Sequence, residues 1–314
     1  MDELFHRFMK SSKSILKGIS VLAMGSLVLV GCTPDTPTQD TDNIETSKID
    51  EPKEVVISPA TKVDGAMFSI PSPIQLGGII KKSGAPYNKD LLNNPKNSDQ
   101  YVDLVSQSLN LGVYGADLGY CALYDKQQES IGFMKSAQNL SDILGISDAF
   151  DMVTIQAIER NLDNKDSLLY VISNSYRKAD DFLQTSDRKH IGALVIVGGW
   201  IESLNFAGAL GKEKKTDNIV DMIGMQKHTI NTILDKMLER YVAEPGVEEV
   251  YNDLDDIRMS FEKVNIKYEY VKPNVDKEKK VTTIKSKTNV EMTDEVFKEI
   301  VEKIAALRAK IINA

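Results

Sequence analysis

Two carboxylates stand inside apolar, glycine-rich segments of this chain, where an unpaired charge would be costly. Asp117 lies within residues 111–120, and Glu202 directly follows Gly198-Gly199-Trp200-Ile201. A buried carboxylate is tolerated only when it is paired or hydrogen-bonded, so each is either a partnered structural acid or part of a polar site. Because small residues let two helices touch, we expect both carboxylates to lie in the same central layer.

Two interpretations of these acids stay open, a structural network and a ligand pocket. In a pocket, Trp200, Tyr114 and Tyr120 would line a groove between helices, with Asp117 and Glu202 at its base. In a network, the acids need donors. The candidate donors are three arginines and three tyrosine hydroxyls: Arg160, Arg177, Arg188, Tyr114, Tyr120 and Tyr176.

Other chemistries find little support in the sequence. His190 and His228 do not stand at zinc-ligand spacing, and the motifs of zinc proteases, serine hydrolases, dinucleotide-binding folds and P-loops are absent. The polar turn 161–166 lacks the glycine and the glutamate of a calcium loop. We therefore predict no metal site, no cofactor and no catalytic residue.

Hydrophobic periodicity predicts helices from residue 98 onward, which Ser98 would cap. The predicted helices cover 98–123, 128–144, 147–160, 168–183, 187–210, 216–241 and 247–264. Upstream, Gly77-Gly78 and 83–86 are expected to break a short apolar segment. The pattern predicts an all-α multi-helix bundle of about seven helices over residues 63–265.

The C-terminal residues 266–314 differ in character. Ile266, Tyr268 and Tyr270 alternate with charged residues, and 281–287 could pair back with them as a β-hairpin. A disordered basic connector is the alternative. Thr293 would cap a last amphipathic helix that docks on the bundle or binds a partner. The fold class is thus an all-α bundle with a small hairpin-plus-helix extension.

The N-terminus has the order of parts of a secretory signal. Met1–Lys17 carries four cations, and Gly18–Val30 is an apolar run of 13 residues. As a helix the run spans roughly 20 Å, too short for a permanent crossing of a hydrocarbon core of about 30 Å. The ending Leu29-Val30-Gly31-Cys32 resembles the lipobox of bacterial lipoproteins. That resemblance implies removal of residues 1–31 and attachment of lipid to Cys32. Because Thr33 rather than aspartate follows, it also implies the outer membrane.

Residues 32–62 are rich in Thr, Pro, Asp and Glu and cannot form a core, so we expect a disordered tether. Such a segment averages roughly 30 Å end to end and can extend to about 100 Å. With Cys32 lipidated, Cys121 has no partner cysteine in the chain. Cys121 is then better explained as a small buried side chain than as a reactive thiol.

The net charge restricts the classes of partner. The chain carries −8, and residues 1–31 contribute +2, so the chain without them carries −8 − 2 = −10. This charge argues against non-specific nucleic-acid binding, which depends on Lys and Arg, and against a flat contact with anionic lipid.

A second resemblance covers the folded part. Ile70-Pro71-Ser72-Pro73, residues 109–120 and residues 198–202 are together similar to helical lipoproteins of the Bacteroidota, which implies an envelope location and a helical body but no activity. We therefore expect a membrane-anchored lipoprotein of the cell envelope that acts as a non-enzymatic binding or scaffolding module. The alternatives are a subunit of an envelope complex, joined through the C-terminal helix to a protein partner, and a hydrolase of envelope polymers that uses Asp117 and Glu202. Both the periplasmic and the surface-exposed side of the outer membrane fit these features.

Overall fold

A computed structural model describes the folded part of the chain, and in it residues Glu51–Ala314 form one compact unit. Its described residues are 70–147, 188–273 and 286–314, single residues between 157 and 178, and the backbone of 61–63, 66–68, 274–276 and 281–283. The predicted signal peptide, Cys32 and nearly all of the tether lie outside these residues. So do most of the helices predicted over 147–160 and 168–183.

Helices make up most of the described residues, which confirms the predicted all-α class. The α-helices whose bounds lie within the described residues are α2 (Pro73–Lys82), α3 (Leu104–Leu123), α4 (Gln127–Ile143), α7 (Lys189–Glu213), α8 (Asp217–Gly224), α9 (Gln226–Thr232), α10 (Val247–Phe261) and α11 (Asp294–Ile312). Shorter turns are the 3₁₀ segments η1 (Lys89–Leu91), η2 (Pro95–Asp99) and η5 (Glu239–Tyr241) and the π-helical segment η4 (Ile233–Leu238).

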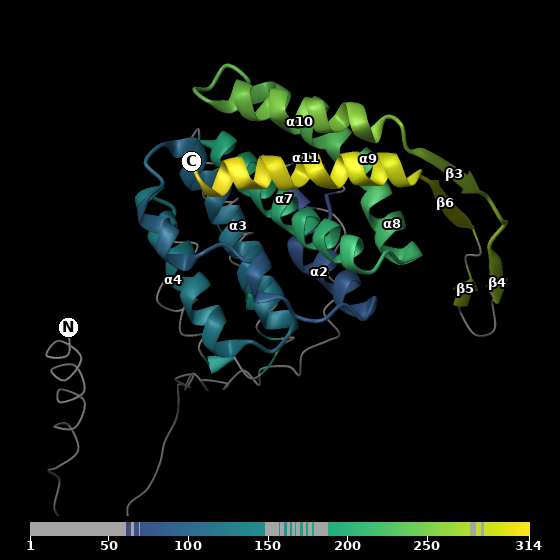
Figure 1. Ribbon diagram of the computed structural model, residues 1–314, viewed down its shortest axis with the longest axis horizontal. Coiled ribbons are helices and arrows are strands. Elements are labelled where there is room, and N and C mark those ends of the chain that lie inside the picture. Colours follow the sequence, from purple (N-terminus) through teal and green to yellow (C-terminus); the bar gives the residue numbers. More distant parts are fainter. Residues whose placement is uncertain are drawn as a thin grey trace, which may run out of the picture. The chain divides into compact units, whose positions relative to one another are not determined.

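Helix α7 lies at the centre of the bundle (Figure 1). It contacts α2, α3, α8 and α11, while α4 packs on α3 and α10 packs on α11. By length and composition α7 could cross a membrane, but 83% of its most apolar window is buried inside the bundle. Its apolar character on every side therefore fits a core helix that other helices surround.

Glycines let α3 and α7 cross with their backbones in contact. A Cβ atom on Gly198 would lie 1.9 Å from the Leu109 carbonyl oxygen, and a Cβ on Gly112 would lie 2.0 Å from that of Val195. No side chain fits at either position, so these two glycines bring Asp117 and Glu202 onto facing helices.

The strands form antiparallel pairs, and most of them belong to one projecting hairpin. Strands β1 (Thr61–Val63) and β2 (Ala66–Phe68) pair with each other before the bundle begins. Near the C-terminus, β3 (Asn265–Glu269) pairs with β6 (Lys287–Glu291), and β4 (Asn274–Asp276) pairs with β5 (Val281–Thr283). We call residues 265–291 the ribbon (Figure 1). It confirms a small hairpin in this region, but residues 281–283 pair with 274–276, and 266–269 pair with 287–290, rather than 281–287 with 266–270.

The last helix, α11, docks on the bundle. Thr293 caps it as predicted, since its Oγ1 accepts a hydrogen bond from the Val296 N–H at 3.3 Å. Its apolar stripe, which consists of Phe297, Ile300, Val301, Ile304, Leu307 and Ile311, is buried in the core. The helix packs on α3, α7 and α10, so its apolar face is used within the chain.

Two predicted boundaries before α3 were wrong. Gly77-Gly78 do not break the chain but lie inside α2, because Ser72 starts that helix with a capping box and Pro73 fits its first turn. Ser98 does not cap α3 either. It belongs to η2, and Asp103 caps α3 by accepting a hydrogen bond from the Ser106 N–H at 2.9 Å.

The single helix predicted over 216–241 was also wrong. Thr216 does cap its start, but the segment is divided into α8, α9, η4 and η5. The break follows Gly224, where a Cβ atom would lie 2.3 Å from Val290 of the ribbon. The ribbon base therefore packs closely on the glycine at which the break occurs.

Candidate functional site

The structure brings Asp117 and Glu202 together in the centre of the bundle. Both side chains are fully buried, Asp117 on α3 and Glu202 on α7, and their carboxyl groups interact electrostatically. Asp117 Oδ2 accepts a hydrogen bond from the Asn93 N–H at 3.3 Å, whereas Oδ1 meets no donor among the described groups. Two carboxylates repel each other unless one of them carries a proton.

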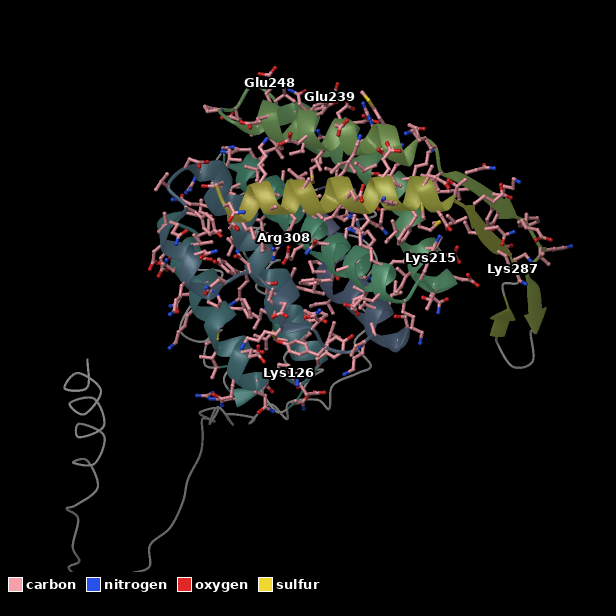
Figure 2. All side chains as sticks on the ribbon, viewed as in Figure 1. Lys126, Lys215, Glu239, Glu248, Lys287 and Arg308 are labelled. Carbon is pink, nitrogen blue, oxygen red and sulfur yellow. The ribbon has the colours of Figure 1, made fainter. Side chains whose placement is uncertain are left out.

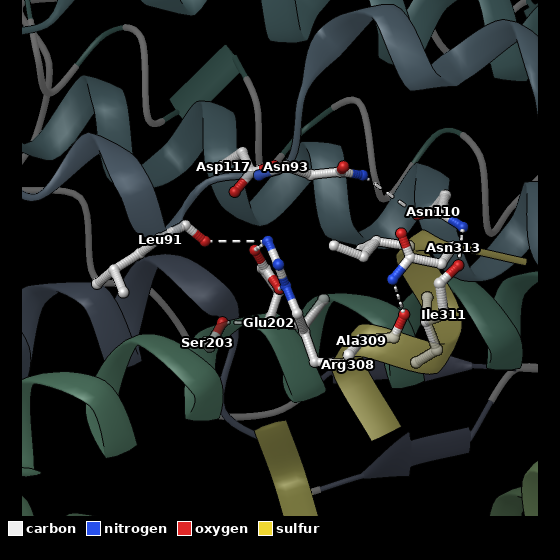
Figure 3. Close-up of polar contacts among 12 residues, drawn as sticks. Leu91, Asn93, Asn110, Asp117, Glu202, Ser203, Arg308, Ala309, Ile311 and Asn313 are labelled. Atoms are coloured by element: carbon white, nitrogen blue, oxygen red, sulfur yellow. Dashed lines mark hydrogen bonds and ion pairs between the residues drawn. The ribbon is translucent and has the colours of Figure 1, made fainter. Parts of the chain in front are cut away.

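Arg308 of α11 neutralises Glu202. Its Nε donates to Glu202 Oε2 and its Nη2 donates to Oε1, each at 2.8 Å, and Nη2 also donates to the Leu91 carbonyl oxygen at 3.0 Å. The arginine side chain is only 13% exposed. Figure 3 shows the guanidinium between Leu91 and Glu202. This bidentate geometry is that of a guanidinium–carboxylate ion pair.

Asp117 is correspondingly the protonated member. Burial raises the pKa of Asp117 well above its usual range, and the charge of Glu202 raises it further, while Arg308 acts in the opposite direction. A proton on Asp117 allows its carboxyl to donate to Glu202. One buried negative charge then faces one buried positive charge, and the core holds no net charge at this point.

The network continues from the carboxyl pair to the end of α11. The Asn93 amide donates to the Tyr101 hydroxyl at 3.0 Å and to the Asn110 side chain at 3.3 Å. Asn110 Nδ2 donates to the Ile311 carbonyl at 2.8 Å, and the Tyr101 hydroxyl donates to the Ile312 carbonyl at 3.2 Å. The last carbonyls of a helix lack partners within it, so these bonds fasten the C-terminal end of α11.

The three candidate aromatic residues are buried but do not line one groove. Tyr114 packs against Phe133 of α4, and its hydroxyl donates to the Asn94 carbonyl at 2.9 Å. Tyr120 packs against Phe206 of α7 with ring centroids 4.6 Å apart. Trp200 Nε1 donates to the Gln226 side chain at 3.0 Å.

Two clefts among the described residues lie elsewhere. The larger holds about 400 Å³ between α8 and the ribbon base. Its lining consists of Lys215, Asp217, Val220, Asp221, Asn289, Val290 and Met292. The smaller holds about 30 Å³ beside the start of α8. None of the five candidate residues lines either cleft.

Cys121 is fully buried, and its thiol lies 3.7 Å from the Tyr87 hydroxyl. Burial raises the pKa of the Cys121 thiol to about 12, which keeps it protonated. Among the described residues, no group of three His, Cys, Asp or Glu side chains could hold a metal ion.

The sequence did not identify the cation that pairs with Glu202. Arg188 instead donates to the Leu144 carbonyl, and Arg177 and Tyr176 lie outside the described residues. The signal for Arg308 was its position four residues after Ile304 and three before Ile311, on the apolar stripe of α11. A charge on a buried stripe requires a buried partner.

Comparisons with models of protein families, with curated proteins and with solved structures find no match to this chain.

Proposed function

We propose that this protein is a lipid-anchored lipoprotein of the bacterial cell envelope that acts as a non-enzymatic binding or scaffolding module. Lipid on Cys32 would hold it at the outer membrane, and residues 32–62 would be the tether. The support for the anchor is the order of basic leader, short apolar run and Leu29-Val30-Gly31-Cys32. Two or more acyl chains on one cysteine give a stable membrane attachment.

The observation that favours a non-enzymatic role is that the five candidate residues are buried and make their polar contacts within the chain. Asp117, Glu202, Tyr114, Tyr120 and Trp200 are each at most 1% exposed. Each makes polar contacts to groups of its own chain. An acid pair that hydrolysed a polymer would have to reach its substrate, whereas these acids lie beneath Arg308 and α11. The outer surface is therefore where we expect a partner to bind.

The alternative role of α11 as a partner-binding helix has less support. The apolar residues that would have contacted a partner are in the core, and its end is fastened by Asn110 and Tyr101. A scaffolding role would therefore use other exposed surfaces.

The anchor is tested by labelling cells with an alkyne-bearing fatty acid and purifying the protein. We expect the label on the unaltered protein and on Cys121→Ala, because the buried thiol is not modified, and no label on Cys32→Ala. The unaltered protein should fractionate with membranes. An unlabelled parent protein, or equal labelling of Cys32→Ala, would show that this cysteine is not the anchor.

A further inference from the structure

Strand β3 has one edge that is paired and one that is open. Its residues Asn265–Glu269 pair with β6 on one side, and no strand of the described residues pairs with the other side. Because β6 is the strand that contacts α8, β3 is the outer strand of the ribbon (Figure 1). The open edge of a strand presents backbone N–H and C=O groups that can pair with a further strand.

The devices that usually protect an open edge are nearly absent from β3. Its register with β6 contains no bulge, and the strand contains no proline. All of its side chains are exposed except that of Ile266, which is partly buried against the core. Lys267 is the one lysine of the strand, and it already pairs with Glu291 of β6 at 2.6 Å. Since natural sheets prevent edge-to-edge association with lysines, prolines and bulges, this edge is open to pairing.

One face of β3 carries an apolar stripe. Residues two apart on a strand share a face, so Ile266 and Tyr268 lie on the same side together with Tyr270, which directly follows the strand. The two tyrosines are 64% and 68% exposed. A two-stranded ribbon is marginally stable in water, whereas three or more strands with an apolar face are stable. A partner strand should therefore bring apolar side chains to this face.

The opposite face of β3 carries charges of both signs. Lys267 and Glu269 share it, and Lys287 of β6 stands opposite Glu269 in the register. Figure 2 shows Lys287 on the ribbon, away from the bundle. Glu269 forms no ion pair within the described part of the chain. A complementary partner strand would place a cation opposite Glu269 and an acid opposite Lys267.

A second copy of β3 meets both requirements in one register. When two β3 strands run antiparallel with Tyr268 opposite its counterpart, Lys267 of each copy stands opposite Glu269 of the other. In the same register, Ile266 of each copy stands opposite Tyr270 of the other. Directly opposite side chains lie on the same face, so apolar residues meet on one side and opposite charges meet on the other.

The neighbouring registers do not match. A register centred on residue 267 sets two lysines opposite each other, and one centred on residue 269 sets two glutamates opposite each other. A register with Tyr268 opposite Glu269 brings the apolar stripe of one copy to the charged face of the other. The register centred on Tyr268 is also two-fold symmetric and closed. The pattern of β3 therefore selects a second copy of the same strand as its partner.

We propose that two copies of this chain associate through their β3 edges, antiparallel and centred on Tyr268, and so form a four-stranded sheet in the order β6–β3–β3–β6. On one face, the contacts between Ile266 and Tyr270 flank the central pair of tyrosines. On the other face, Lys267 of each copy pairs with Glu269 of the other. This association does not depend on a lipid anchor, so it is independent of the function proposed above.

Sedimentation equilibrium of residues 51–314, the compact unit that contains the bundle and the ribbon, tests the association. We expect twice the monomer mass at about 100 μM, a concentration that exceeds micromolar dissociation constants. Circular dichroism of every variant checks that the bundle is folded. A parent protein that stays monomeric at this concentration would overturn the proposal.

Two variants reverse the charges between the copies while each ribbon keeps its own opposite charges. Lys267→Glu with Glu291→Lys sets acid opposite acid at the β3 edge, and Glu269→Lys with Lys287→Glu sets cation opposite cation. Neither changes the net charge of the chain, and each should associate at least about ten-fold more weakly than the parent, since like charges directly opposite each other destabilise a strand pair. An equimolar mixture of the two should recover the dimer, because the acids of one variant meet the cations of the other.

The matched control is Glu291→Lys alone. It removes the ion pair of Lys267 within the ribbon but leaves the β3 edge unchanged, so it should remain dimeric. A dimer that survives both reversals, or a mixture of the two variants that stays monomeric, would overturn the proposal.

Cysteine cross-linking under a mild oxidant tests the register. Tyr268→Cys places two thiols opposite each other with Cα atoms about 4.5–5.5 Å apart, which is within the range of a disulfide. Tyr270→Cys places them four residues apart along the strands, at least about 13 Å. The buried Cys121 is the same in both variants. We expect the disulfide-linked dimer to form at least about ten-fold faster with Tyr268→Cys. Equal rates, or a faster reaction of Tyr270→Cys, would overturn the proposed pairing.

Discussion

Glu202 depends on Arg308, because no other cation is bonded to its buried carboxylate among the described residues. Replacing Arg308 with Met keeps most of the unbranched apolar stem and removes the charged guanidinium. We expect Arg308→Met to lower the free energy of unfolding by about 3–5 kcal/mol, since a buried charge is left without its partner. Urea unfolding followed by Trp200 fluorescence measures the loss.

The matched control for this substitution is Lys303→Met on the same helix. Lys303 pairs with Asp256 at 2.8 Å, but that acid is 62% exposed. The loss of an ion pair so open to water should cost at most about 1 kcal/mol. Equal losses in the two variants would mean that Arg308 does not neutralise a buried charge.

Two of the residues at the centre of the network could be predicted from the sequence. Asp117 and Glu202 stand out because each interrupts a long apolar segment, and the expectation that they share one layer follows from the glycines beside them. Arg308 could not be assigned to them. It is 106 residues from Glu202, and local periodicity does not say which buried stripes face each other.

The crossing of α3 and α7 depends on glycine rather than on side-chain packing. A methyl group at Gly198 would collide with the backbone of Leu109, which cannot rotate away. We expect Gly198→Ala to lower the free energy of unfolding by about 1–3 kcal/mol or more, as overpacking does. Thermal unfolding monitored by circular dichroism measures the change.

Gly78→Ala is the control for this element, because no atom lies within 4 Å of the added Cβ in α2. Alanine favours a helix interior over glycine, so this variant should gain about 0.5–1 kcal/mol. If both variants were stabilised, α3 and α7 would not be in backbone contact.

The start of a helix could be predicted only where a capping residue next to it determined the boundary. Thr293 caps α11 and Thr216 caps α8 because a threonine precedes each apolar pattern. Gly77-Gly78 were misread as a break, since the capping box at Ser72 outweighs their low helix propensity. The division of 216–241 could not be predicted, because it accompanies the contact between Gly224 and Val290 of the distant ribbon.

In the whole described unit, the class of fold followed from periodicity, but the position of the last helix did not. The sequence allowed α11 either to dock or to bind a partner, whereas in the structure it covers α7 and closes the polar network. Its docking joins residue 308 to residues 91 and 202 and makes the last helix part of the core.

The most direct test of the account is whether Asp117 is a neutral member of a structural network. The free energy of unfolding is measured for the parent protein and Asp117→Asn at about pH 4.5 and about pH 7.5, both above the ordinary aspartate pKa of about 3.9 that applies in the unfolded chain. Because the pKa of Asp117 is raised in the folded state, the unfolded chain loses its proton first as pH increases. The parent should therefore lose stability relative to the variant, by up to about 1.4 kcal/mol per pH unit.

The neutral asparagine has the shape of a protonated aspartate. It does not titrate, so it removes the contribution of residue 117 to the pH dependence of the free energy of unfolding. The account predicts that the free energy of unfolding of Asp117→Asn increases relative to that of the parent protein as pH rises. A difference that stays constant across this range, or that moves in favour of the parent protein, would mean that Asp117 is already ionised in the folded state. The two carboxylates would then be a charged pair available for a ligand, which would contradict the account.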